Sequence, residues 1–180
     1  MMADFQSVQP ETACAVEAPA LCGEAAAASP RQRYALLAVD PGTTESGWCL
    51  FDGRRVLDSG TLPNGAMLEH IRAAGVDRLA IEMIDCLGMP VGREVFETCL
   101  WIGRMVQSWR DPDAVRLVYR REVKLHLCGT ARAKDANIRQ ALIDRLGPVG
   151  VKKAPGPLYG VKSHAWAALA VALTATEVKA

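Results

Sequence analysis

The chain has 180 residues, half of them apolar, and a formal net charge of +1. This length can bury one core of ordinary domain size and excludes a pair of full catalytic domains. No apolar run approaches the roughly 20 residues that a membrane-spanning helix needs, and no signal-peptide pattern opens the chain. We therefore expect a soluble, cytoplasmic protein that does not associate with a membrane.

The first 30 residues differ in composition from the rest. They hold four acids, no Lys or Arg, and an alanine run before Ser29-Pro30. This segment lacks a sustained hydrophobic period, which predicts a disordered, Ala- and acid-rich leader over 1–33 and a single domain over 34–180. The other 150 residues carry 21 bases and 16 acids, and this excess of +5 permits a polyanionic partner.

Hydrophobic periodicity and turn residues predict the elements in chain order. A three-stranded meander comes first, with strands at 35–40, 46–51 and 55–61. A short helix at 65–74 and a strand at 78–84 follow. The rest of the chain is predicted to hold helices at 93–109, 121–127, 134–146 and 162–174, a strand at 115–119 and a loop at 147–160. Three strands followed by strands that alternate with helices predict an α/β domain with a mixed sheet.

The strongest functional signal is Asp40, which follows the apolar run Leu36–Val39. This run is short, β-compatible and stopped by Pro41-Gly42, so it predicts a strand buried on both faces. A carboxylate at the end of such a strand is costly without a partner and invites a metal ion or a hydrogen-bond donor. Asp40 could instead cap the turn through its own backbone contacts.

Several segments resemble RuvC-type Holliday junction resolvases, most of all their phage and prophage relatives, in the same order. The segment Ala38–Trp48, AVDPGTTESGW, is similar to the first strand and turn of that family, and Leu79–Glu82 is similar to its second acidic strand. The remaining blocks are Arg121–Lys124, Gly129 with Ala133–Asp135, and Ser163–Ala172. The resemblance covers about 34–174. It implies a ribonuclease H-like fold with a mixed five-stranded sheet and helices on both faces.

The same resemblance implies an endonuclease that depends on Mg²⁺ or Mn²⁺ and acts as a homodimer on branched DNA. Two divalent ions about 3.5–4 Å apart can activate a water and stabilise the departing oxygen, and they prefer oxygen ligands. By position, Asp40 and Glu82 would supply such ligands. Glu82 could instead form an ion pair with Arg78 or Arg93.

The last predicted helix departs from the commoner family pattern, which places two acids three residues apart at its start. Here these positions hold His164 and Ala167. Some resolvases carry a histidine at the first position, where it could ligate metal or transfer a proton near neutral pH. The missing acid leaves open whether one or two ions bind, and Asp85 or Asp135 could compensate.

Basic residues fall where the resemblance implies contacts near the scissile phosphate: Arg121, Lys124, Arg132 and Lys134. Phosphate neutralisation dominates the affinity of proteins for nucleic acid, although a solvated surface also explains such residues. Trp101, Trp109 and Tyr159 could stack on bases. The two tryptophans lie on the helix predicted at 93–109, which favours packing against the core or a dimer partner.

Two alternatives accompany the predicted function, which is metal-dependent cleavage of branched DNA in recombination, repair or phage DNA processing. Asp40–Thr44 also resembles the phosphate-binding turn of actin-like ATPases and sugar kinases, but those proteins clasp a nucleotide between two such domains. A DNA-binding relative without catalytic activity is the other alternative, because Ala167 replaces an acid.

Overall fold

The computed structural model describes residues 35–86, 88 and 90–178, so the predicted leader at 1–33 lies outside the described residues. The described residues form a five-stranded sheet of β1 (Leu36–Asp40), β2 (Glu45–Phe51), β3 (Val56–Pro63), β4 (Arg78–Met83) and β5 (Arg116–Tyr119). The strand order is β3-β2-β1-β4-β5. The first three strands pair antiparallel, and β4 and β5 continue the sheet parallel to β1. The predicted meander and mixed sheet are confirmed.

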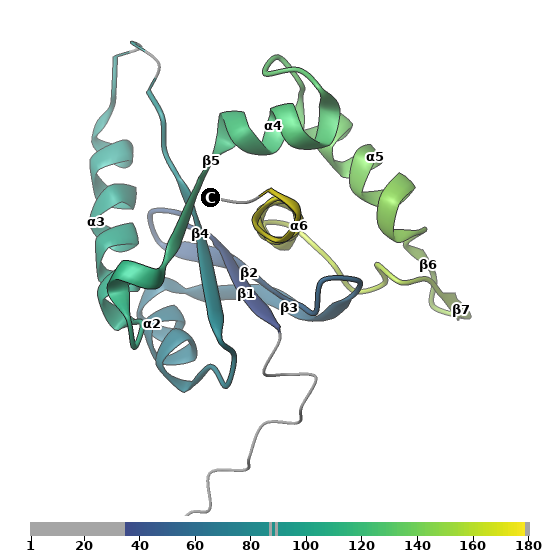
Figure 1. Cartoon of the computed structure of the whole chain (residues 1–180), viewed down its shortest axis with the longest axis horizontal. Coiled ribbons are helices and arrows are strands. Elements are labelled where there is room, and N and C mark those ends of the chain that lie inside the picture. The colour runs from purple at the N-terminus through teal and green to yellow at the C-terminus, as the bar shows by residue number, and fades with distance from the viewer. Residues whose placement is uncertain (1–34, 87, 89, 179–180) are drawn as a thin grey trace, which may run out of the picture.

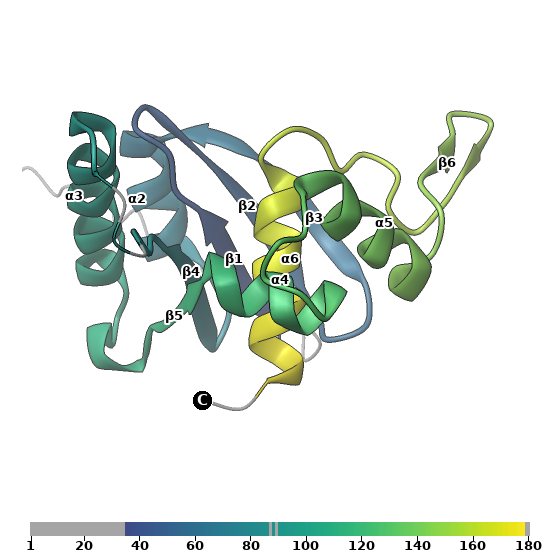
Figure 2. The same cartoon turned by 90° about the horizontal axis from the view of Figure 1, so that it is seen from above.

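Helices cover both faces of this sheet, as predicted. They are α2 (Asn64–Ala73), α3 (Arg93–Ser108), the short 3-10 helix η1 (Pro112–Ala114), α4 (Arg120–Cys128), α5 (Asp135–Leu146) and α6 (Ala165–Glu177). Figure 1 shows α2 and α3 on one side of the sheet and α6 on the other, with α4 and α5 beyond α6. Figure 2 shows the same layers from above.

The alternation of side chains along each strand divides the interior into two cores. On β1, Leu36 and Ala38 pack toward α6, whereas Leu37 and Val39 pack toward α2 and α3. On β4, Ala80 belongs to the α6 side of the sheet. Alternate residues of a strand share a face. Asp40, two positions after Ala38, and Glu82, two positions after Ala80, therefore also point toward α6.

Helix α6 begins at Ala165 and ends at Glu177, whereas the prediction placed a helix at 162–174. The start is later because the backbone turns sharply before it, with φ of +97° at Gly160 and +45° at Ser163. Residues 168–175 are all buried, since α6 lies between the sheet and the pair α4 and α5. None of the helices in the described ranges, α6 included, is long and apolar enough to cross a membrane.

The segment predicted as a loop at 147–160 contains a small hairpin, β6 (Gly150–Val151) and β7 (Ala154–Pro155). Gly150 has φ of +72°, and a Cβ there would lie 2.3 Å from the Gly156 nitrogen. Strands of two residues are too short to give a periodic signal, which explains the missed prediction. The hairpin projects from the body of the molecule beyond α5 (Figure 2).

Candidate active site

Asp40 is the last residue of β1 and Glu82 is the last but one of the adjacent parallel strand β4, and both point to the same side of the sheet. Val39 pairs with Ile81 in the register of β1 and β4, so the next residue of each strand lies beside the other. Both acids follow an α6-facing alanine by two positions and therefore share its face. The side chains are 19% and 11% exposed. The sequence-predicted pair of carboxylates thus lies together at one end of the sheet.

The two carboxyl groups lie within hydrogen-bonding reach of each other when one of them is protonated. Burial raises the pKa of Asp40, although the contact with Glu82 and the charge of Arg120 act against that rise. Burial also raises the pKa of Glu82; Arg120 opposes this rise and the Asp40 charge adds to it. The Glu82 Oε2 atom is buried, and no donor in the described part of the chain reaches it. A cation between these groups would relieve this electrostatic cost.

His164 lies next to this pair, at the start of α6. Its Nδ1 is 3.5 Å from Asp40 Oδ2, its Nε2 is 3.9 Å from Glu45 Oε1, and its side chain is half exposed. The approach depends on Gly47, which pairs with Asp40 in the sheet. A Cβ on Gly47 would lie 2.4 Å from the carbonyl carbon and oxygen of His164. Only glycine at this position of β2 permits the observed placement of the histidine.

Arg120 is a residue of the site that the sequence reasoning did not select. Its Nη1 is 3.4 Å from Glu82 Oε1, and its Nη2 donates a hydrogen bond to Asp135 Oδ1. The ion pair that Glu82 forms is therefore with Arg120, and not with Arg78 or Arg93 as the alternative interpretation had it. Burial lowers the pKa of Arg120, but Glu82, Asp135 and Asp40 together raise it. Its place beside Glu82 follows from the pairing of β4 with β5, which brings the residue after β5 close to the end of β4.

A buried polar network holds the turn that follows Asp40. The Gly42 N–H donates to Ser46 Oγ at 3.3 Å, and this hydroxyl donates to Asn64 Oδ1 at 2.6 Å. Asn64 Nδ2 returns a hydrogen bond to the Gly42 carbonyl at 2.9 Å. Ser46 and Asn64 are both buried, so their polar atoms satisfy one another and the turn. Sequence reasoning missed both residues, because neither belongs to a charged or metal-binding pattern.

The carboxylates, His164 and Arg120 line one cleft of about 570 Å³. Its lining includes every acid and the histidine that the sequence analysis considered, together with two arginines: Asp40, Glu82, Asp85, Asp135, His164, Arg120 and Arg139. Asp135, the first residue of α5, is mostly exposed at the rim. The Arg139 guanidinium lies over the Trp166 ring, 4.4 Å from its centroid.

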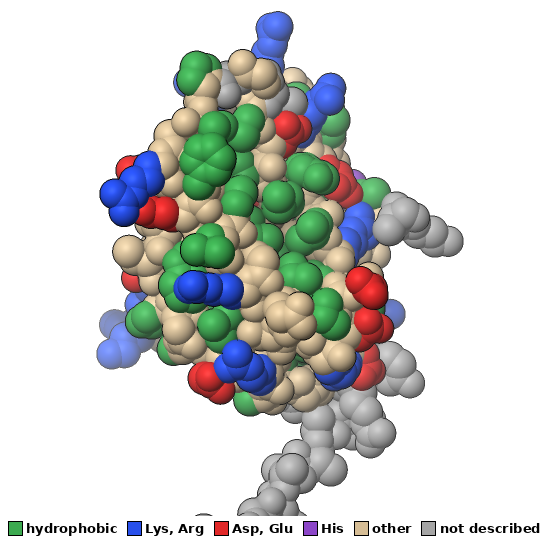
Figure 3. Space-filling model, turned by 90° about the vertical axis from the view of Figure 1, so that its left-hand side faces the viewer, with side chains coloured by type: hydrophobic (Ala, Val, Ile, Leu, Met, Phe, Trp, Pro, Cys, Tyr) green, Lys and Arg blue, Asp and Glu red, His purple; other side chains and the backbone are tan. Residues whose placement is uncertain are grey.

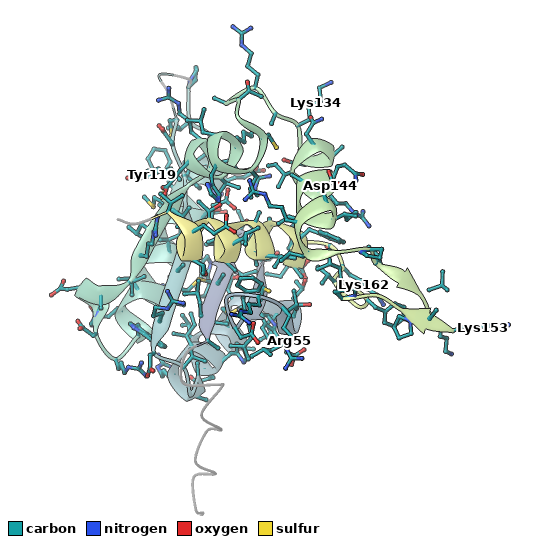
Figure 4. The ribbon with its side chains drawn as sticks, turned by 45° about the vertical axis from the view of Figure 1, so that its right-hand side comes forward. Arg55, Tyr119, Lys134, Asp144, Lys153 and Lys162 are labelled. Atoms are coloured by element: carbon teal, nitrogen blue, oxygen red, sulfur yellow. The ribbon has the colours of Figure 1, made fainter. Side chains whose placement is uncertain are left out.

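The basic residues proposed to bind nucleic acid lie outside the cleft lining. Arg121 and Lys124 belong to α4, and Arg132 and Lys134 belong to the α4–α5 connection. Figure 4 shows Lys134 at the start of α5 and Lys153 at the far end of the β6–β7 hairpin.

The aromatic candidates divide between core and surface. Trp109 is 4% exposed in the core under α2 and α3, and Trp101 packs against that core. The structure thus supports packing over base stacking for these two tryptophans. Tyr159 is 48% exposed.

The oxygen ligands at the base of the cleft suit one hard divalent cation. Asp40 and Glu82 offer adjacent carboxylate oxygens, one of them without a hydrogen-bond donor, and such ligands suit Mg²⁺ and Mn²⁺. The described residues contain no ready-made cluster of three or more His, Cys, Asp or Glu side chains for a metal ion. His164 is the nearest candidate for a third protein ligand.

This sheet and its helices define an α/β domain with a ribonuclease H-like fold. Among solved structures, the fold is similar to that of Thermus thermophilus RuvC in complex with a Holliday junction substrate, with a TM-score of 0.57 and 21% identity over 78% of this chain and 92% of that chain. A second Thermus thermophilus RuvC structure gives a TM-score of 0.56 and 20% identity over the same shares. No family model and no curated protein matches the sequence. The predicted resemblance to RuvC is confirmed for the fold.

Proposed function

We propose that this protein is a metal-dependent endonuclease that hydrolyses phosphodiester bonds in branched DNA. The observation that carries the proposal is the meeting of Asp40 and Glu82 at the ends of adjacent strands, in an open cleft and with one buried oxygen that lacks a donor. The RuvC fold supports the same function, since one RuvC structure of this fold holds a Holliday junction substrate. Branched DNA is therefore the proposed partner.

In this proposal Asp40 and Glu82 hold Mg²⁺ or Mn²⁺, and His164 completes the ligand set or transfers a proton to the departing oxygen. When bound, such an ion would supply Lewis-acid stabilisation and lower the pKa of a coordinated water. The water oxygen bonds to phosphorus while the P–O3′ bond breaks, which leaves a 5′-phosphate and a 3′-hydroxyl. Arg121, Lys124, Arg132 and Lys134 bind the DNA backbone beyond the cleft, so added salt should weaken binding steeply.

We also propose that the nuclease acts as a homodimer, because symmetric cutting of two strands needs two sites. The exposed face of α3 supports this assignment. Phe96 and Leu100 lie one helical turn apart and are 64% and 57% exposed; we call this pair the α3 patch. Figure 3 shows apolar side chains gathered on this side of the molecule. The proposed unit spans 34–180 and acts in the cytoplasm, in recombination, repair or phage DNA processing.

Substitution of Asp40 by Asn tests the proposed activity. We expect Asp40→Asn to lower the rate of Mn²⁺-dependent cutting of a labelled four-way junction by about 10³-fold or more, because ion-bound catalysis supplies several kcal/mol. Binding of the junction, measured by mobility shift, should persist. Asp58→Asn changes an exposed acid on β3 and serves as the matched control.

Three results would contradict the proposal in different ways. Cutting by Asp40→Asn at the wild-type rate would show that Asp40 does not belong to the catalytic site. A wild-type protein that shifts junctions but never cuts them would be a non-catalytic binder. A protein that consumes ATP and neither binds nor cuts junctions would be a phosphotransferase of the actin-like or sugar-kinase type.

A further inference from the structure

Arg120 is a positive charge built into the acidic end of the cleft. It is the first residue of α4, and its side chain is 29% exposed. One terminal nitrogen lies 3.4 Å from Glu82 Oε1 and the other bonds to Asp135. The guanidinium thus connects β4 to the start of α5 and lies beside the carboxylates that we assign to the metal ion.

The charges that line the cleft balance with one divalent ion. Six charged residues line the cleft, four acids and two arginines: Asp40, Glu82, Asp85, Asp135, Arg120 and Arg139. Their net charge is −2 when all four acids are ionised and His164 is neutral. One Mg²⁺ or Mn²⁺ neutralises this charge. A second ion would leave an excess of two positive charges, and Ala167 supplies no further oxygen ligand for it.

We propose that Arg120 takes the place of a second divalent ion. It restricts the cleft to one ion and donates N–H groups to the phosphodiester that is cut. A guanidinium has five N–H donors in a plane that matches phosphate oxygens, so its contacts with Glu82 and Asp135 leave donors available. A fixed donor of this kind stabilises the charge that develops on phosphate oxygens during cutting. This inference rests on the proposed function.

Calorimetric titration with Mn²⁺, without DNA, tests the ion count directly. We expect one ion per chain for the wild type and for Arg120→Lys, which keeps the charge. Arg120→Ala should bind a second ion, because it frees carboxylate oxygens of Glu82 and Asp135. Arg72→Ala removes an arginine that pairs with Glu69 on α2 and should behave as the wild type. Two ions in the wild type, or one ion in Arg120→Ala, would overturn the inference.

Single-turnover cutting of a four-way junction tests the contact with phosphate. At saturating protein, and at a Mn²⁺ concentration that fills only the first ion site of Arg120→Ala, we expect this variant to cut about 10²-fold more slowly, with junction affinity changed by less than about threefold. Arg120→Lys should recover part of this rate, and circular dichroism checks that each variant is folded. Arg120→Ala that is folded and cuts at the wild-type rate would overturn the role of Arg120 while leaving the nuclease proposal intact. If the wild type cuts no branched DNA, the nuclease proposal fails, and the contact with phosphate fails with it.

Discussion

The two sides of the sheet share the same strands and yet differ in character. On the side of α2 and α3, apolar residues such as Leu37 and Ile81 build a core, and α3 leaves an apolar patch exposed. On the side of α6, small residues such as Ala38 and Ala80 are followed by Asp40 and Glu82. The side-chain alternation of a strand thus places both acids on one side, and the opposite side is left for packing and, in the proposed homodimer, for assembly.

The two sides of the sheet can be tested by substitution, and the largest effect, loss of the proposed dimer, is expected on the α3 side. Phe96→Glu puts a charge into the α3 patch, and a buried charge without a partner opposes association. By light scattering we expect the wild type to be a dimer, as proposed above, and Phe96→Glu to be a monomer at the same concentration. Val151→Glu changes a residue of equal 64% exposure on the β6–β7 hairpin and should leave the molar mass of the assembly unchanged. A Phe96→Glu dimer would assign assembly to another surface.

The next effect is expected on the α6 side, where Gly47→Ala would displace His164. The added Cβ would lie 2.4 Å from the His164 backbone, so the start of α6 must move. We expect junction cutting to fall by about 10- to 100-fold, with little change in DNA binding. Gly65→Ala is the control, since among the described residues its Cβ would meet no atom within 4 Å outside its chain neighbours and the backbone of its own helix. Unchanged cutting by Gly47→Ala would show that the position of His164 is not critical.

The smallest expected effect concerns the pH dependence of stability. The raised pKa of folded Glu82 means that the unfolded chain loses its proton first as the pH rises above the ordinary value of 4.5. The contribution to the free energy of unfolding is therefore largest at low pH and falls as the pH increases. Relative to the wild type, Glu82→Gln should gain roughly 1–3 kcal/mol between about pH 5 and pH 8 in metal-free urea denaturation.

Two further measurements sharpen this prediction. Glu69→Gln changes an exposed acid on α2 and should follow the wild-type curve at every pH. Saturating Mn²⁺ should reverse the trend for the wild type, because ion binding requires ionised carboxylates. Parallel pH curves for the wild type and Glu82→Gln without metal would contradict a raised pKa at Glu82.

Sequence patterns predict the strands and most helices well, because these elements have clear periodicity and are separated by glycine and proline. The helix predicted at 93–109 is α3, Arg93–Ser108, and the strand predicted at 78–84 is β4, Arg78–Met83. The start of α6 was less predictable, since it depends on the backbone turns at Gly160 and Ser163. The burial of α6 was also not predictable from its own sequence, since it comes from the sheet on one side and from α4 and α5 on the other.

The residues of the site also divide into those that the sequence predicts and those that it does not. The order of acidic segments predicts that Asp40 and Glu82 act together, and the structure brings them together. Arg120 could not be assigned as a partner of Glu82 from sequence, because the contact arises from the pairing of β4 with β5 and from the place where α4 begins. Asn64 was equally hidden, since its contacts cross from α2 to the turn after β1.

The hydrogen bonds among Gly42, Ser46 and Asn64 have a consequence for how the protein responds to loss of metal. They hold the turn that follows Asp40 through contacts within the protein, so the backbone beside this carboxylate is positioned without an ion. A chelator should therefore abolish the activity of the proposed enzyme without unfolding it, and added metal should restore the activity without a refolding step. In the proposed nuclease the ion would therefore bind reversibly to a protein that is already folded.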